Sequence, residues 1–270
     1  MQFPEAERVI YERNPLKLVV CQLRFPVDLH IEMGMTAGFQ DKIRSRFPFA
    51  EEHTDESIPL MANEMSEQFP KELVESLSAA INRQFQFMTE DKVWTIGLTR
   101  NFAALETSNY EKWEDFRKNI DLTLSALVES YKLPFFTRVG LRYVNVIDRV
   151  GLGLQGCEWR DLLADFITGP LAIQGYELHI PEYKATHMIE LENPEDVVRI
   201  QHGLIGESST EEYKSVYVLD NDFFTKADTV TEVDNVIRRL DDYNSQNRGL
   251  FQSCIKDKLH RAMGPKHRRH

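Results

Sequence analysis

Apolar and polar residues alternate in several short stretches of the chain, as they do in strands that bury one face. The first stretch is residues 18–25, where Gln22 and Arg24 fall on the face opposite Val19, Cys21, Leu23 and Phe25. Residues 84–88 and 92–102 follow as a hairpin around Thr89-Glu90-Asp91. A long strand is then predicted over residues 135–148. The first half of the chain therefore contains four predicted strands.

Between these strands, apolar residues recur about every four positions, which is typical of amphipathic helices. The first repeat runs from Ile31 to Phe47 and predicts a single helix that ends at Pro48. The second follows Ser108-x-x-Glu111, which has capping-box spacing, and predicts a helix that ends before Pro134. The resulting order of strands and helices is that of a ferredoxin-like βαββαβ unit over residues 1–150. Residues 48–80 are acidic and are interpreted as an insertion with a short helix near 71–80.

The second half, residues 151–265, predicts an α-β-β-β-α order that is a degenerate echo of the first. A glycine-containing loop at 151–156 leads to a short helix at 158–167. Strands at 184–192, 196–204 and 214–219 are joined by short turns, so the sheet is expected to be antiparallel. A long C-terminal helix runs from Thr231 to about Met263, with a bend or break at Gly249. The overall prediction is an α+β protein that ends in a basic tail at residues 266–270.

Composition removes several classes of function from consideration. The 270 residues carry 43 acidic and 32 basic side chains, a net charge of −11, which disfavours non-specific binding to nucleic acid. Three scattered cysteines without a CxxC pair indicate neither a disulfide framework nor a cysteine-rich zinc site. We find no membrane-spanning stretch and no secretory signal, so the expected location is the cytoplasm, without membrane attachment.

One predicted surface is suited to recognition. The sheet face opposite the core is expected to carry a flat, cationic platform made of Arg24, Arg138 and Arg142 with Thr95 and Thr99, beside Gly97 and Gly140. Arginine binds carboxylates and phosphates through two parallel hydrogen bonds, and glycine lets a partner approach closely. The alternative is structural, because such a face is polar by default or packs against the second half with its arginines paired to acids. Asn145, on the inward face, is likewise interpreted as a structural amide.

Two groups of residues have side chains that could carry out chemistry. Asp220 and Asp222 offer two carboxylates at i, i+2 that could hold a hard cation, although both also suit an ordinary turn. His187 and His202 lie in adjacent predicted strands and could face each other, but two imidazoles without a third ligand do not make a zinc site.

Other catalytic motifs are missing from the sequence or out of context. No GxSxG or Walker motif occurs, and Gly151-x-Gly153-x-x-Gly156 does not follow a buried parallel strand. Cys21 is expected to be a small buried residue rather than a nucleophile. No cofactor is therefore expected.

Three motifs carry a family resemblance that spans nearly the whole chain. These are Tyr11-x-x-Asn14-Pro15-Leu16 followed by Gln22-Leu23-Arg24-Phe25, then residues 138–145, and then Leu219-Asp220-x-Asp222-Phe223 followed by a long helix with Phe251 near its middle. They resemble a sporadically distributed prokaryotic protein family of uncharacterised function. The patchy occurrence of that family implies at most a role in phage defence or in a toxin–antidote locus.

The sequence thus favours a non-enzymatic cytoplasmic interaction protein that binds a protein partner or associates with itself. The final helix and residues 48–80 are the expected docking surfaces. Two alternatives stay open. One is a nucleic-acid-binding or RNA-processing module of duplicated ferredoxin-like type that uses the arginines, and the other is a metal-dependent hydrolase around Asp220 and Asp222.

Overall fold

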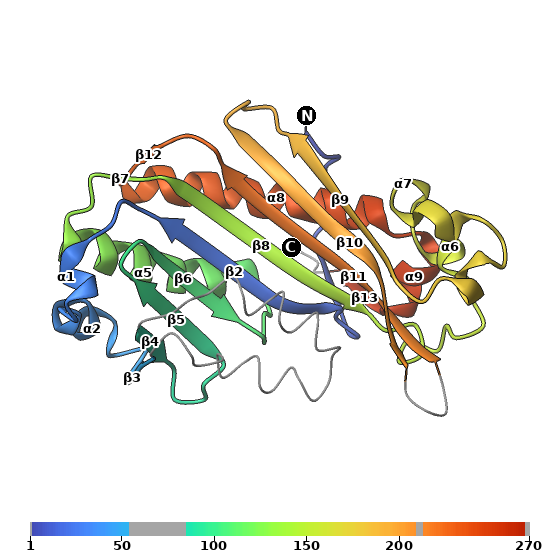
Figure 1. Ribbon diagram of the computed structural model, residues 1–270, viewed down its shortest axis with the longest axis horizontal. Helices are drawn as coiled ribbons and strands as arrows, with labels where there is room; N and C mark the ends of the chain where they lie inside the picture. Colours follow the sequence, from blue (N-terminus) through green and yellow to red (C-terminus); the bar gives the residue numbers. More distant parts are fainter. Residues whose placement is uncertain (1, 54–84, 209–212, 268–270) are drawn as a thin grey trace. The chain divides into compact units, whose positions relative to one another are not determined.

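The computed structural model describes residues 2–53, 85–208 and 213–267. It is a mixed α+β structure with antiparallel sheet, several helices and a C-terminal helix, which confirms the predicted class at that level (Figure 1). The chain divides into two compact units that interleave along the sequence rather than separating at residue 150. Unit 1 comprises residues 1–17, 142–223 and 242–270, and unit 2 comprises residues 18–141 and 224–241.

Unit 2 is built around the strands of the first half of the chain. Its strands are β2 (Leu16–Arg24, from Leu18 onward), β3 (Phe49–Glu52), β4 (Phe85–Met88), β5 (Trp94–Thr99), β6 (Phe102–Thr107), β7 (Phe135–Phe136), the start of β8 (Arg138–Ile147) and β12 (Thr229–Val230). The strand order is β3-β4-β5-β6-β2-β8, and β7 pairs separately with β12. The pairs β3–β4, β4–β5, β5–β6 and β2–β6 all run antiparallel.

The helices of unit 2 differ from the predicted ones in two respects. The expected helix from Ile31 to Phe47 is divided into α1 (Leu29–Glu32) and α2 (Ala37–Ile43), because the chain turns at Gly34 with a φ of +76°. Helix α5 (Trp113–Tyr131) begins after Lys112 without a side-chain cap, so the predicted capping box is wrong. The long predicted strand at 92–102 ends at Thr99, and a turn leads into β6, which the sequence pattern did not separate.

Buried apolar side chains from α2, α5 and the strands form the core of unit 2. Phe39 and Ile43 from α2, and Phe116, Ile120 and Leu124 from α5, are essentially inaccessible to solvent. Helix α5 lies behind β6 and β5 in the view of Figure 1. The face with Val19, Cys21 and Leu23 is therefore the core face, as predicted. The short helix expected near 71–80 lies outside the described residues.

Unit 1 contains the second antiparallel group of strands. Its strands are β1 (Val9–Tyr11), the remainder of β8, β9 (Tyr183–Glu190), β10 (Asp196–Ser208), β11 (Tyr213–Thr225, to Phe223) and β13 (Pro265–His267). The order is β8-β11-β10-β9, with β1 paired separately to β13. The predicted basic tail is thus partly a strand, because Pro265, Lys266 and His267 pair with Tyr11, Ile10 and Val9.

The helices of unit 1 are shorter than predicted. The expected helix at 158–167 is two helical turns, α6 (Trp159–Leu162) and α7 (Asp165–Thr168), followed by the 3-10 turns η1 (Gly169–Ala172) and η2 (Tyr176–His179). The C-terminal helix α8 (Val233–Cys254) belongs to unit 1 from Asp242 onward, and α9 (Asp257–Ala262) follows it. Helix α8 passes through Gly249 without interruption, so the break expected there is wrong; it falls instead at Ile255 and Lys256.

Candidate functional site

The predicted cationic platform is not an open surface. Thr95 and Thr99 of β5 are 4% and 7% exposed, and the whole of β5, including Gly97, is buried. The hydroxyl of Thr99 accepts a hydrogen bond from the amide of Phe102 at 3.2 Å and so stabilises the turn into β6. The expectation that these two threonines are available to a partner is wrong.

The three arginines of the predicted platform have different surroundings. Arg24 is exposed, and its Nε donates to Gln22 Oε1 at 3.1 Å. Arg138 is half-buried, with its guanidinium 3.8 Å above the ring of Phe224, a cation–π contact within unit 2. Arg142 belongs to unit 1, whereas Arg24 and Arg138 belong to unit 2.

Arg142 forms a buried, bidentate ion pair within unit 1. Its Nε and Nη2 donate to the two carboxylate oxygens of Asp220 at 2.8 and 2.6 Å, and the side chains are 13% and 10% exposed. Burial by itself lowers the pKa of Arg142, but the carboxylate of Asp220 outweighs burial, and the pKa is raised. The guanidinium of Arg142, which the sequence analysis expected to bind a ligand, is therefore bound to Asp220 of the neighbouring strand β11.

The second carboxylate of the candidate metal pair is also engaged by an arginine. Arg199 of β10 donates from Nη2 to Asp222 Oδ2 at 2.9 Å. Both aspartates lie within β11 rather than in a turn after a strand. Among the residues that the structure describes, no group of three or more His, Cys, Asp or Glu side chains is placed to hold a metal ion. The carboxylates of Asp220 and Asp222 thus neutralise two arginines between strands.

The two histidines do face each other, as predicted. His187 of β9 and His202 of β10 have their Nε2 atoms 2.9 Å apart. Their ring planes differ by 17° and their centroids are 5.0 Å apart, so the rings meet through the two nitrogens and not face to face. His202 is 4% exposed, whereas His187 is exposed.

The hydrogen bonds around His202 show which atom donates and which accepts in each contact. Tyr217 donates its hydroxyl proton to the carbonyl of Ile167 at 2.7 Å, so it accepts from Nδ1–H of His202, also at 2.7 Å. Nε2 of His202 then carries the lone pair and accepts from Nε2–H of His187. The result is a chain of hydrogen bonds from the exposed imidazole of His187 to the buried carbonyl of Ile167. The chain holds β9, β10 and β11 together, and the described residues add no metal-binding group to it.

Burial of His202 predicts a dependence of stability on pH. Desolvation, followed by the nearby His187, lowers the pKa of His202 from its ordinary value of 6.5 to about 4. The unfolded chain binds more protons than the folded chain between these values, so the free energy of unfolding falls as pH drops from about 6.5 towards about 4.

We expect His202→Gln to remove part of this pH dependence. The imidazole of His202 is in contact with the exposed His187, so screening by solvent limits its contribution to the pH dependence of the free energy of unfolding to about 1 kcal/mol. Urea unfolding on both sides of that pH interval measures the slope. The exposed His179 provides the control, and His179→Gln is expected to leave the slope unchanged. An equal slope in wild type and His202→Gln contradicts the assignment.

The sequence analysis missed one exposed apolar segment among the described residues of unit 2. Within residues 27–35, the exposed fractions of Val27, Leu29, Met33 and Met35 are 54%, 63%, 77% and 58%. The four-residue repeat had placed Met35 on the buried face of a single helix, which is wrong because the helix ends before Gly34. We call residues 27–35 the docking segment. The glycine at 34 was the available signal, since a glycine inside a helical repeat weakens the helix.

The remaining candidates have structural surroundings. Asn145 is 4% exposed and donates to the carbonyl of Leu219 at 3.3 Å, which links β8 to β11. Cys21 is 2% exposed, and burial raises the pKa of its thiol to about 12, so it is inert, as predicted. No helix within the described parts of the chain is both long and apolar enough to cross a membrane.

Comparisons with known proteins add no assignment. No protein-family model matches the chain, and no curated protein matches it. The resemblance to the sporadically distributed prokaryotic family remains an expectation from the sequence motifs.

Proposed function

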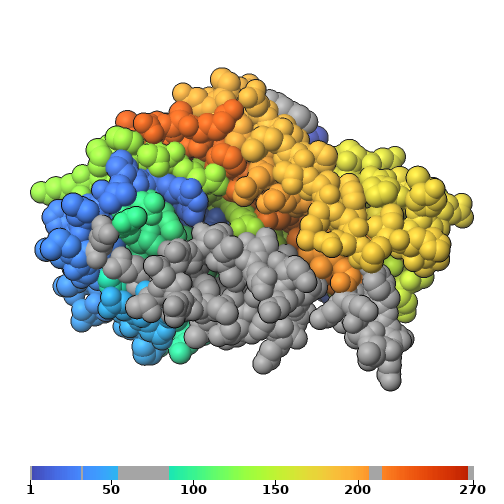
Figure 2. Space-filling view, viewed as in Figure 1, coloured from blue at the N-terminus to red at the C-terminus, as the bar shows by residue number. Residues whose placement is uncertain are grey.

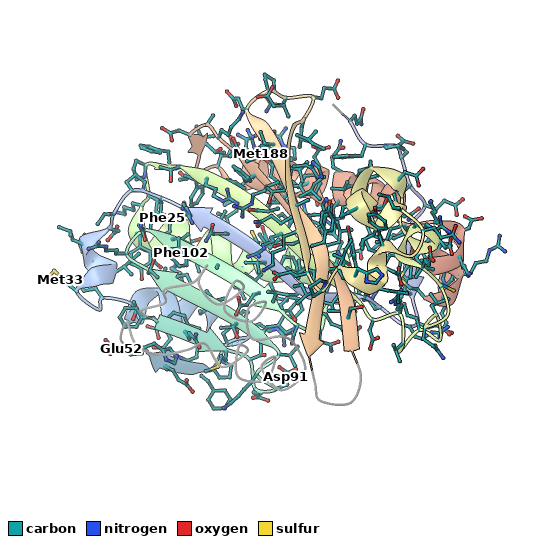
Figure 3. The ribbon with its side chains drawn as sticks, turned by 45° about the vertical axis from the view of Figure 1, so that its right-hand side comes forward. Phe25, Met33, Glu52, Asp91, Phe102 and Met188 are labelled. Atoms are coloured by element: carbon teal, nitrogen blue, oxygen red, sulfur yellow. The ribbon has the colours of Figure 1, made fainter. Side chains whose placement is uncertain are left out.

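We propose that this protein is a non-enzymatic interaction protein of the cytoplasm that binds a protein partner through the docking segment. The observation that carries the proposal is the presence of four apolar side chains, each more than half exposed, within nine residues. Single exposed apolar residues are ordinary, but a local concentration of them marks an interaction site. Figure 3 shows Met33 at the outer end of α1, directed away from the strands of unit 2.

The backbone beneath these side chains is held in place. Ile31 is fully buried and anchors α1, and Asp28 caps it by accepting from the amide of His30 at 2.8 Å. The amides of Phe25 and Asp28 donate to the carbonyls of Asn101 and Arg100 in the turn between β5 and β6. A segment already held in shape loses little conformational entropy on binding, and this favours affinity.

The chemistry of the segment indicates an apolar partner surface. Leucine and methionine bury area without requiring hydrogen-bond partners, and the flexible thioether of methionine adapts to irregular surfaces. Arg142, Asp220 and Asp222 are satisfied within unit 1. Nucleic-acid binding or metal-dependent hydrolysis through these residues would first require these ion pairs to break.

Two further proposals complete this assignment. Unit 2 is proposed to be ferredoxin-like, because β2, β5, β6 and β8 follow the βαββαβ chain order with β2 between β6 and β8. The family resemblance supports a place for the protein in a phage-defence or toxin–antidote locus, where binding a partner protein is the activity required.

Affinity capture with matched variants tests the docking segment. We expect Leu29→Ser combined with Met33→Ser to lose a partner that the parent retains, with at least about tenfold weaker binding because two apolar contacts are removed. Val230→Ser is the control, since Val230 is 59% exposed in unit 2 but lies outside the segment. If the double variant retains the same partners as the parent and the control, the docking segment is not the binding surface.

A further inference from the structure

Strand β9 is the last strand in the order β8-β11-β10-β9, so no described strand pairs with its outer edge. His187, Met188 and Thr186 are consecutive and all exposed, and Met188 is 59% exposed. Figure 2 shows the gold atoms of the β9 and β10 region at the surface that faces the viewer, and Figure 3 labels Met188 on β9. A strand at the end of a sheet is a template for pairing with another extended chain, and five of the eight residues of β9 are exposed.

The sequence of β9 is complementary to itself when it is read antiparallel. In an antiparallel pair centred on His187, Lys184 lies opposite Glu190 of the other strand, and this contact occurs twice. The same register places Ala185 opposite Ile189 and Thr186 opposite Met188. A centre at Thr186 puts Lys184 opposite Met188, and a centre at Met188 puts Glu190 opposite Thr186. The register centred on His187 is therefore the one that pairs both charged residues of the strand with opposite charges.

The side chain of Lys184 can change partners at low cost. Lys184 contacts Glu182 on the same chain at 2.5 Å, and both side chains are more than half exposed. Exposed ion pairs of this kind contribute little to stability, so Lys184 can exchange Glu182 for a carboxylate of another chain without a large loss. His187 keeps its hydrogen bond to His202 whether or not β9 pairs with another chain, because His202 lies on β10, on the side away from the outer edge of β9.

We propose that β9 pairs antiparallel with β9 of a second copy of this chain, with His187 at the two-fold axis and two Lys184–Glu190 ion pairs between the copies. The interface is isologous, and its backbone hydrogen bonds extend the sheet across the axis. The charge complementarity of the strand with itself is what favours a second copy over an unrelated peptide.

Charge reversal on the full-length chain tests both the interface and its register. Lys184→Glu places like charges opposite each other at two positions, and so does Glu190→Lys, so each variant is expected to raise the dimer dissociation constant about tenfold or more. The double variant Lys184→Glu, Glu190→Lys restores opposite charges and is expected to dimerise as the parent does. An equimolar mixture of the two single variants is expected to form heterodimers, because each supplies what the other lacks.

Light scattering after size-exclusion chromatography across a dilution series measures the mass of each sample. Lys42→Glu, an exposed reversal in unit 2, is the control and is expected to dimerise normally. A parent that stays monomeric throughout overturns the proposal, including the case in which it binds an extended peptide instead. A dimer that neither single reversal weakens, or single variants that do not combine, overturns it as well. These results are independent of the docking segment, whose variants leave β9 unchanged.

Discussion

Asp220→Ala is expected to lower the free energy of unfolding by about 3–5 kcal/mol, which is the usual cost of breaking a buried ion pair by removing one partner. The cost arises because Arg142 stays charged and remains buried after its carboxylate is lost. Both of its donors to Asp220 are then left without that acceptor, and the side chain of Arg142 is only 13% exposed. Urea unfolding at neutral pH, followed by circular dichroism, measures the change.

Two controls separate this effect from a general loss of charge. Asp165 is 89% exposed and contacts Lys256 at 2.7 Å, so Asp165→Ala is expected to cost no more than about 1 kcal/mol. Replacing both partners, as Arg142→Met with Asp220→Leu, removes the unpaired charge and is expected to recover most of the loss. If Asp220→Ala costs no more than the exposed control, the ion pair does not stabilise the strand pair β8–β11.

Gly249→Ala is expected to destabilise the protein by about 1–3 kcal/mol, although alanine is the better helix former by about 1 kcal/mol. The N-terminal segment of unit 1 lies against α8 at this residue. A Cβ on Gly249 would be 2.2 Å from the carbonyl oxygen of Pro4 and 3.2 Å from Cβ of Phe3. The amide of Phe3 also donates to Gln246 at 2.9 Å, so the segment cannot move away without losing a buried hydrogen bond.

The neighbouring Ser245 is a matched control on the same helix. Ser245 is exposed, so Ser245→Ala changes helix propensity without a new contact and is expected to stabilise the protein by a few tenths of a kcal/mol. The two alanine substitutions are thus expected to have opposite signs in thermal unfolding. If Gly249→Ala does not lower the free energy of unfolding, the N-terminal segment can move away from α8 without loss of stability, and the prediction is contradicted.

Local alternation was sufficient to predict most strands and their buried faces. The faces of β2 and the meeting of His187 with His202 were both predicted, because side chains in strands alternate strictly and adjacent strands joined by a short turn have a restricted register. The division of the 92–107 region into β5 and β6 was not predicted, since a tight turn at Arg100 and Asn101 interrupts the apolar pattern only briefly.

The sequence could not identify the candidate sites in the same way. The alternation of apolar and polar residues around Arg142 is the same whether its side chain faces solvent or a carboxylate. Its partner Asp220 is 78 residues away in the sequence. The sequence pattern did not predict the docking segment either. Met35 continues the four-residue apolar repeat and was therefore expected to be buried, but the chain turns at Gly34 and leaves Met35 exposed.

The amino-acid sequence by itself determined the α+β class, the faces of the strands and the acidic character of this protein, because these properties depend on composition and on spacing between near neighbours. Only the tertiary structure decided which charges are neutralised, where the helices end and why residue 249 is a glycine. Each of these depends on contacts between residues far apart in the chain, such as Arg142 with Asp220 and Gly249 with Pro4. The spacing of residues along the sequence does not predict such contacts.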